Sequence, residues 1–272
     1  MNDIMTKASS VHSLFDLSGR VAVVTGGAKG LGEAAALAIA GAGADVVIAG
    51  KTQENNKHTS AQIREMGRKS LAIQVEVQEE DQVKEMVAKV QEKFGRLDII
   101  VNSAGIADVK PICEFPIDEW QKIMDVNVRG TLLCSREAAK VMISQGKGKI
   151  INISSMQSFL GRSGDPAYSA SKAAINLMTM SMACEWGEKG ICVNAIAPTW
   201  CWTDLTRPIL EIKEFYNKLQ TRVPMGRAGN REDIFGLTVL LASDASDFIN
   251  GTIIPLDGGT VAFDGFPPVP AV

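Results

Sequence analysis

The stretch Val21 to Gly32, VAVVTGGAKGLG, takes the chain from its first strand-like run into a glycine-rich turn. An alanine-rich helical segment follows the turn. Glycines in such a turn let the backbone approach a pyrophosphate, and the free N–H groups at the start of the helix attract its negative charge. A glycine cluster alone is weak evidence, because many loops are rich in glycine. Its place between a strand and a helix predicts a dinucleotide-binding site.

Strand-like runs alternate with longer helical patterns along the chain. Seven runs have this character: residues 21–24, 45–49, 71–75, 97–102, 149–153, 192–197 and 252–255. Several are almost wholly apolar, which is typical of parallel strands buried on both faces of a sheet. We therefore predict a single-domain α/β fold, Rossmann-like and doubly wound, with a seven-stranded parallel sheet and helices on both faces.

Helix signals are clearest in residues 79–95, where acidic residues begin an amphipathic segment and Gly95 ends it. Residues 114–142 and 175–186 also have the pattern of helices, with more apolar surface than one core needs. We predict an oxidoreductase-type domain at residues 18–263, with a substrate lid at about 199–223. Residues 1–17 are then an N-terminal extension with a frayed end, and residues 264–272 an irregular C-terminal tail.

The composition is that of an ordinary globular protein: of 272 residues, 46% are apolar and 22% charged, and the net charge is −3. Without a basic excess, nucleic acid is not expected as a partner. The five cysteines are an odd number without CxxC spacing, which indicates reduced thiols and gives no support to a metal site. Residues 1–16 lack the apolar core of a secretory signal, and residues 34–44 are too few to span a membrane. We expect a cytoplasmic protein.

A tyrosine and a lysine, Tyr168 and Lys172, stand four residues apart, thirteen residues after Ser155. On a helix, positions i and i+4 share a face. The pKa of an isolated tyrosine is about 10, and a neighbouring cation favours the phenolate and lowers that value. The pair could thus move a proton at neutral pH. The alternative is a chance pair on a solvated helix face, and only the rest of the chain can decide between the two.

Further motifs accompany the pair in a fixed order. The glycines follow a GxxxGxG spacing at Gly26, Gly30 and Gly32, and Asn102-Ser103-Ala104-Gly105, Asn127 and Ser154-Ser155 come before Tyr168. Together these motifs closely resemble the short-chain dehydrogenase/reductase family, over roughly residues 18–260. The pattern is similar to 3-oxoacyl-carrier-protein reductases, gluconate 5-dehydrogenases and glucose dehydrogenases. The resemblance implies hydride transfer between a nicotinamide and a carbonyl or secondary alcohol, which makes the chain an enzyme acting on a CH–OH/C=O group.

The family's catalytic roles fall on four residues. The resemblance assigns Tyr168 as the proton donor or acceptor, and Lys172 as the residue that lowers the tyrosine pKa and holds the nicotinamide ribose. It assigns Ser155 to the substrate oxygen and Asn127 to a water-linked proton path to the lysine. Hydride transfer to a carbonyl builds negative charge on oxygen, and two hydroxyl groups are suitable donors for it.

Cofactor contacts follow from the same resemblance. Asn102, Ala104 and Gly105 flank the cofactor, although Ser103 replaces the family's second Asn. Thr203 stands five residues after Pro198, where the family places a contact with the nicotinamide carboxamide, but Thr199 replaces the usual Gly. Glu76 and Val77 take the place of an Asp-Val pair beside the adenine. The predicted cofactor residues are Gly26, Lys29, Gly30, Leu31, Gly32, Lys51, Glu76, Val77, Asn102, Ala104, Gly105, Tyr168, Lys172, Pro198 and Thr203.

The second strand-like run ends without a carboxylate. An acidic residue there would bind the adenine ribose hydroxyls and favour NAD. Here Gly50 is followed by Lys51, and Lys29 is a second cation in the glycine turn. This pattern favours NADP(H) over NAD(H), the alternative being that both lysines are simply solvated.

The residues expected to select the substrate leave its chemistry open. The lid contributes Trp200, Trp202, Leu205, Phe215 and Tyr216, with Arg207 and Arg222 as cations, and the segment before Tyr168 contributes Met156, Gln157, Phe159, Leu160 and Arg162. Such a pocket suits a hydrophobic or cyclic ketone or alcohol, and an arginine could equally hold an anionic group.

Two other functions remain as alternatives: a dinucleotide-binding sensor or scaffold without catalysis, and an epimerase or dehydratase. The first predicts loss of at least one of the four catalytic residues, and the second usually needs a larger C-terminal domain. By analogy with relatives that pair the matching helices, we expect a homotetramer.

Overall fold

The computed structural model describes residue 4 and residues 8–265, and its strands form one sheet. In this described part, seven parallel strands stand in the order β3-β2-β1-β4-β5-β6-β7. Their bounds are Val21–Thr25 (β1), Asp45–Gly50 (β2), Ser70–Gln74 (β3), Ile99–Asn102 (β4), Gly148–Ile153 (β5), Ile191–Pro198 (β6) and Ile253–Leu256 (β7). The predicted fold class is confirmed.

The strand order reverses beside β1, because β2 and β3 lie on one side of it and β4 to β7 on the other. Thr25 at the end of β1 pairs with Ala49 in β2 and with Asn102 at the end of β4. Asn102 in turn pairs with Asn152 in β5. The loops that leave these strands therefore begin side by side at one edge of the sheet. The place where the strand order reverses is the topological switch point, and ligands of open α/β sheets bind there.

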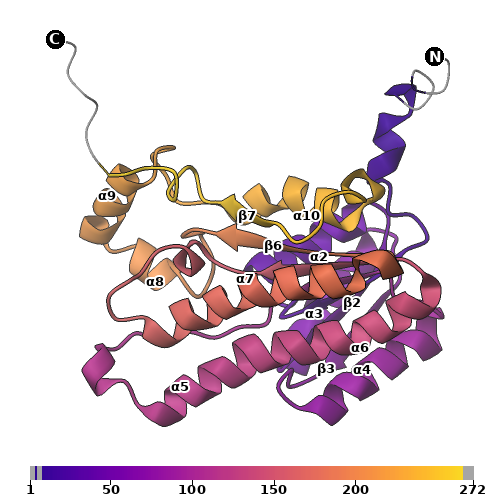
Figure 1. Cartoon of the computed structure of the whole chain (residues 1–272), viewed down its shortest axis with the longest axis horizontal. Coiled ribbons are helices and arrows are strands. Elements are labelled where there is room, and N and C mark those ends of the chain that lie inside the picture. The colour runs from indigo at the N-terminus through magenta and orange to yellow at the C-terminus, as the bar shows by residue number, and fades with distance from the viewer. Residues whose placement is uncertain (1–3, 5–7, 266–272) are drawn as a thin grey trace.

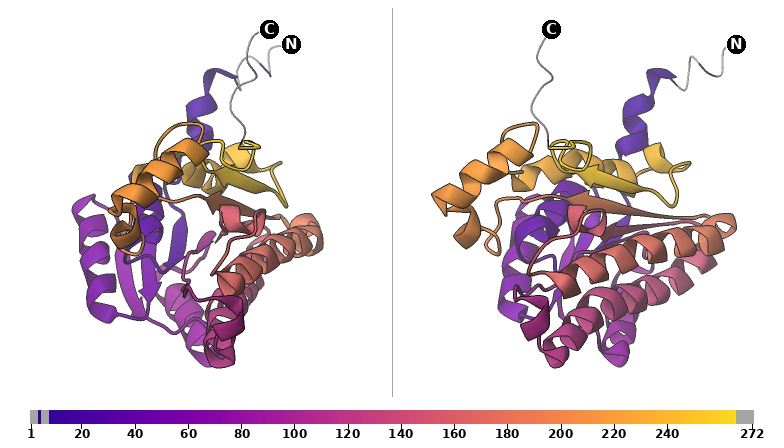
Figure 2. Two further views of the ribbon diagram at one scale, coloured as in Figure 1. Left: turned by 90° about the vertical axis from the view of Figure 1, so that its left-hand side faces the viewer. Right: turned by 60° about the vertical axis from the view of Figure 1, so that its left-hand side comes forward.

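Helices cover both faces of the sheet (Figures 1 and 2). One apolar core joins the sheet to α4 (Glu80–Phe94), α6 (Gly130–Gln145) and α7 (Pro166–Trp186). A second joins it to α2 (Gly30–Gly41), α3 (Gln53–Glu65) and α10 (Phe235–Ala242). The strands thus contribute side chains to both cores, which explains why their sequences show continuous apolar runs instead of alternation.

The helix predicted at residues 79–95 is confirmed as α4, and Gly95 follows it in the left-handed conformation with φ of 73°. The helical pattern predicted at residues 114–142 is confirmed from Ile117 onward, because the chain stays helical from there to Gln145. A 3-10 turn ends at Glu114, α5 (Ile117–Met124) starts after Pro116, and a π-helical turn at Asp125–Arg129 leads into α6. Proline lacks an N–H group to continue a preceding helix, and this sets the start of α5. Residues 175–186 form the second half of α7.

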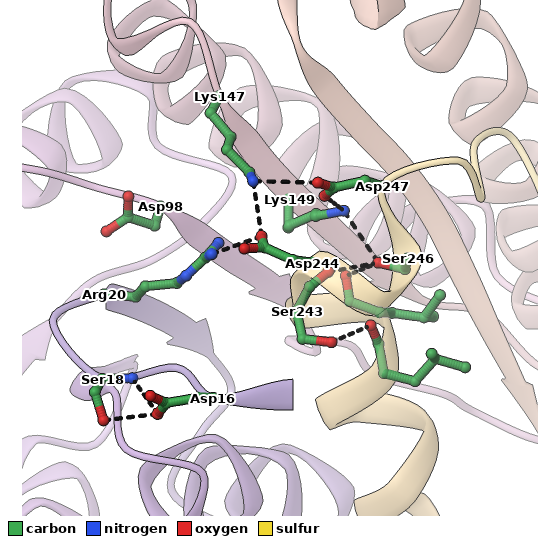
Figure 3. Close-up of polar contacts among 12 residues, drawn as sticks. Asp16, Ser18, Arg20, Asp98, Lys147, Lys149, Ser243, Asp244, Ser246 and Asp247 are labelled. Carbon is green, nitrogen blue, oxygen red and sulfur yellow. Dashed lines mark hydrogen bonds and ion pairs between the residues drawn. The ribbon is translucent and has the colours of Figure 1, made fainter. Parts of the chain in front are cut away.

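An ionic network holds the amino ends of the central strands to the segment after α10 (Figure 3). The Asp244 carboxylate accepts hydrogen bonds from Arg20 at 2.6 Å and Lys147 at 2.7 Å. Lys149 of β5 is almost fully buried, and its ammonium lies 2.8 Å from the Asp247 carboxylate and 3.1 Å from the Ser246 hydroxyl. A buried lysine without a partner would cost several kcal/mol, so these acceptors make its position tolerable. The network lies at the opposite strand ends from the switch point.

The lid predicted at about residues 199–223 contains α8 (Arg207–Leu210) and α9 (Lys213–Arg222), orange in Figure 1. A 3-10 helix at Val11–Phe15 precedes the sheet. The predicted C-terminal tail lies outside the described residues, except for Asp264 and Gly265. In the part of the chain that the structure describes, no helix has the length and apolar character needed to cross a membrane.

Candidate active site

A cavity of about 360 Å³ opens at the carboxyl ends of the strands, beside the switch point. Its volume is in the range of small-molecule sites. Twelve of the predicted site residues line it: Gly26, Lys29, Gly30, Leu31, Gly32, Ala104, Gly105, Ser155, Tyr168, Lys172, Pro198 and Thr203. Segments far apart in the sequence thus meet around one space. Lys51, Glu76, Val77, Asn102 and Asn127 are not among the residues that line the cavity.

The glycine turn is packed too closely to accept side chains. A Cβ atom on Gly26, where φ is 64°, would lie 2.8 Å from the Ala104 Cα, and one on Gly32 would lie 2.3 Å from the Gly26 carbonyl oxygen. Gly30 begins α2, and Gly30 to Gly32 line the cavity. The free N–H groups of the first helical turn therefore form part of the cavity wall. A bare backbone and a helix N-terminus in one wall fit the pyrophosphate of a dinucleotide.

Ser155, Tyr168 and Lys172 line the same cavity as the glycine turn. Ser155 follows β5, and its hydroxyl accepts a hydrogen bond from the Gln157 N–H at 3.2 Å. Tyr168 stands in the first turn of α7, which Pro166 begins. Lys172 lies one turn later; its ammonium donates to the Ile153 carbonyl at 2.7 Å and is 5.4 Å from the centroid of the Tyr168 ring. The lysine is therefore fixed by β5 and held over the tyrosine.

The pKa of Tyr168 is raised to about 12, not lowered as the spacing predicts. Burial disfavours the phenolate and is the largest cause, while a hydrogen bond with the Ser155 side chain acts in the opposite direction. Burial also lowers the pKa of Lys172 to about 8. At neutral pH the site therefore holds a protonated phenol beside a lysine that is still mostly charged, an arrangement suited to giving a proton to an oxygen that gains negative charge.

Asn127 lies buried within the π-helical turn, next to the cavity wall. Its amide nitrogen donates to the Ile106 carbonyl and to the Ser171 hydroxyl, both at 2.9 Å, and its amide oxygen accepts from the Ile106 N–H at 2.8 Å. These bonds hold the loop after β4 against α7. Turns of this type inside helices are frequent at functional sites. The predicted role of Asn127 in a proton path stays a prediction.

Asn102 supports the site from beneath. Its amide nitrogen donates to the Ser135 hydroxyl at 2.9 Å and to the Asn152 amide oxygen at 2.8 Å. Asn152 then donates to the Thr179 hydroxyl at 2.8 Å. All four side chains are buried. The chain of bonds joins β4 and β5 to α6 and α7, as expected of a residue that supports the central sheet.

Lys51 and Glu76 form an ion pair at 3.3 Å, at the ends of β2 and β3. Lys51 is therefore not a free cation. Lys29 is exposed on the glycine turn, and within the described residues it has no ion-pair partner. Val77 packs beneath the start of α6, where a Cβ on Gly130 would lie 2.6 Å from its side chain. Its place is in the core.

The loop after β6 also brings Cys201 and Thr206 to the cavity, and neither was among the predicted site residues. The Thr203 hydroxyl lies 2.9 Å from that of Thr206, which also donates to the Cys201 carbonyl. Thr25 is a second omission: its hydroxyl accepts from the Ser103 N–H at 3.2 Å and so ties the glycine turn to the turn after β4. A Thr at the end of a strand beside a glycine turn was the available signal for it.

Comparison with known proteins agrees with this geometry. A family model described as enoyl-(acyl carrier protein) reductase matches residues 26–261. The chain is 39% identical to 2-dehydro-3-deoxy-D-gluconate 5-dehydrogenase of Bacillus subtilis (strain 168), over 92% of this chain and 97% of that protein. It is 37% identical to gluconate 5-dehydrogenase of Gluconobacter oxydans (strain 621H), over 90% and 96%.

Among solved structures, the chain is similar to gluconate 5-dehydrogenase from Burkholderia cenocepacia J2315 in complex with NADP and tartrate. The TM-score is 0.90 at 35% sequence identity, and the match covers 93% of this chain and 99% of that chain. The similarity therefore spans the sheet, both helix layers and the cavity.

The burial of Lys172 predicts a stability cost. A lysine whose folded pKa, about 8, lies below the ordinary 10.5 opposes folding while it is charged; the cost is full below pH 8 and is lost as the pH rises to 10.5. We expect Lys172→Met to raise the free energy of unfolding at pH 7 by roughly 1–2 kcal/mol. The gain should shrink toward zero near pH 10.5.

Urea unfolding at both pH values measures this difference, with the exposed Lys189→Met as the control. A variant less stable than the wild type at pH 7, or a gain that does not change with pH, would show that the lysine is not strained by burial.

Proposed function

The chain belongs to the short-chain dehydrogenase/reductase family, and on that premise we propose that it interconverts a ketone and a secondary alcohol on a gluconate-type sugar acid, with NADP(H) as the preferred cofactor. The observation that carries the proposal is the meeting of Ser155, Tyr168 and Lys172 with the bare glycine turn around one cavity. A dinucleotide-binding sensor or scaffold would need the turn alone. The acid/base residues have a use only if a bond is made or broken.

Each catalytic side chain has a task that its surroundings support. A bound nicotinamide supplies or accepts the hydride. The Ser155 hydroxyl donates to the substrate oxygen, and Tyr168, kept protonated by burial, gives its proton to that oxygen as negative charge develops. The Lys172 ammonium stabilises the phenolate that remains and reaches the nicotinamide ribose. Asn127 holds the loop over the lysine, where a water-linked proton path would run.

The substrate class rests on the relatives. They are named for oxidation or reduction of gluconate, 2-dehydro-3-deoxy-D-gluconate or 5-keto-D-gluconate, at 34–39% identity over nearly their full lengths. These compounds share a carboxylate and a secondary alcohol or ketone on a polyhydroxy chain. We assign the same class to this chain.

The NADP preference depends mainly on Lys29. It is exposed on the turn that lines the cavity, whereas Lys51 is engaged by Glu76. A 2′-phosphate carries a charge that an unpaired lysine stabilises, and the Glu76 carboxylate weakens the same attraction at Lys51. The solved relatives that hold NADP support this choice.

A homotetramer would cover apolar side chains that α6 and α7 expose. Leu132 and Ile143 of α6 and Leu177 and Met180 of α7 are exposed in the single chain. The predicted domain at residues 18–263 contains both the cavity and these exposed apolar side chains.

Removal of the Tyr168 hydroxyl tests the proposed reaction. We expect Tyr168→Phe to lower kcat for reduction of 5-keto-D-gluconate at least a hundredfold, because general acid catalysis contributes about 10²–10⁴-fold. The measurement is nicotinamide absorbance, with NADPH binding followed by fluorescence to show that the cofactor site is intact. Normal turnover by Tyr168→Phe would refute the assigned mechanism.

Exchange of the lysines tests the cofactor preference. The wild type should show a higher kcat/KM for NADPH than for NADH. Lys29→Ala should lower the NADPH value roughly ten- to hundredfold, as expected for loss of a hydrogen bond to a charged group, and leave the NADH value nearly unchanged. Lys51→Ala, the matched control, should have a smaller effect. A clear NADH preference in the wild type would overturn the assignment.

A further inference from the structure

Three arginines belong to the segments expected to select the substrate, and the structure separates them. Arg207 is exposed and lies 3.8 Å from the Glu211 carboxylate. Arg222 is also exposed, 5.8 Å from the centroid of the Phe263 ring. Arg162 alone of the three is half-buried. Solvent hydrates the first two, whereas Arg162 has lost part of its hydration.

The Arg162 guanidinium is held between aromatic rings of the lid. It stands 4.4 Å from the centroid of the Trp200 ring and 5.7 Å from that of Phe215, and these two rings pack edge to face at 5.1 Å. A cation near the face of an aromatic ring is attracted to the ring's electrons, and this contact uses none of the N–H donors of the guanidinium. Those groups have the geometry that binds a carboxylate through two parallel hydrogen bonds.

No protein acceptor uses these N–H groups. Within residue 4 and residues 8–265, Arg162 forms neither a hydrogen bond nor an ion pair. Asp165 is the carboxylate that acts on its charge, yet the two are not paired, and the Asp165 Oδ1 atom is buried without a partner. Burial raises the pKa of Asp165, while the charge of Arg162 acts in the opposite direction. A half-buried guanidinium without an acceptor is costly unless a ligand supplies one.

Arg162 lies next to the cavity, although neither it nor Trp200 is among the residues that line the cavity. It stands between Ser155 and Tyr168 in the sequence, and Trp200, on which it stacks, is flanked by the cavity residues Thr199 and Cys201. The Thr199 hydroxyl contacts the Met156 sulfur at 3.2 Å, directly after Ser155. The Asp165 charge acts on both Arg162 and Tyr168, which places the cation and the acid in one electrostatic environment.

We propose that Arg162 binds the carboxylate of the substrate and thereby selects acidic over neutral polyhydroxy compounds. The proposal rests on the function proposed above and adds the residue that recognises the carboxylate of the substrate. The carboxylate would complete the guanidinium's hydrogen bonds while the ketone or alcohol reaches Ser155 and Tyr168. Trp200 and Phe215 would keep the Arg162 guanidinium oriented and hold it against the lid.

The test compares an acid with its neutral counterpart. Calorimetry gives the Kd of gluconate and of sorbitol, and steady-state kinetics gives kcat/KM for 5-keto-D-gluconate and for fructose. We expect Arg162→Gln to weaken gluconate binding and kcat/KM for 5-keto-D-gluconate at least tenfold and to leave the neutral compounds unchanged. Arg162→Lys keeps the charge but loses the paired N–H donors of the guanidinium, so its loss of gluconate binding should be intermediate. Arg64→Gln, at an exposed position of α3 outside the segments expected to select the substrate, is the matched control and should behave as the wild type.

Several results would overturn the proposal. One is an equal loss for acid and neutral compounds in Arg162→Gln, which would indicate packing alone. Another is an equal effect of the control Arg64→Gln, and the third is the absence of gluconate binding by the wild type. Failure of the proposed function looks different: gluconate would bind in an Arg162-dependent manner while no substrate consumed NADPH.

Discussion

The backbone of Gly26 packs against that of Ala104 so closely that a single Cβ atom would lie 2.8 Å from the neighbouring Cα. This contact joins the loops after β1 and β4, the two strands at which the order of the sheet reverses. The Thr25 hydroxyl reinforces it through the Ser103 N–H. The first turn of α2, the floor of the cavity and the path open to a pyrophosphate all depend on this approach, which only glycine permits.

In the same cavity, burial decides what the acid/base pair can do. Burial raises the pKa of Tyr168, so the phenol stays protonated, and it lowers the pKa of Lys172, so the ammonium loses its proton more easily. Burial causes both shifts, although Tyr168 keeps partial exposure where it lines the cavity. An active site of this kind is built at some cost in stability, because polar groups are placed where solvent cannot reach them.

The sequence predicted the fold well because its strands are buried on both faces, and their apolar runs mark them within one or two residues. Twelve of the site residues that the family resemblance implied line the cavity, whereas Lys51, Glu76, Val77, Asn102 and Asn127 do not. The helical pattern at residues 114–142 was confirmed from Ile117 onward, but apolar periodicity did not show that Pro116 precedes the helix or that a π-helical turn lies within it. The direction of the Tyr168 pKa shift was wrong because spacing reveals a neighbouring cation and not the depth of burial. The Lys51–Glu76 pair and the stacking of Arg162 on Trp200 join segments distant in sequence, and no local pattern encodes them.

We propose that this cavity brings a nicotinamide and a sugar-acid carbonyl together for direct hydride transfer. The most direct measurement uses NADPH with deuterium on one or the other face of the nicotinamide, 5-keto-D-gluconate as the substrate, and mass spectrometry of the reduced acid. We expect one of the two labelled cofactors to place a single deuterium on the carbon that carried the ketone. A reduced product without deuterium from either form, or no oxidation of the cofactor, would contradict it.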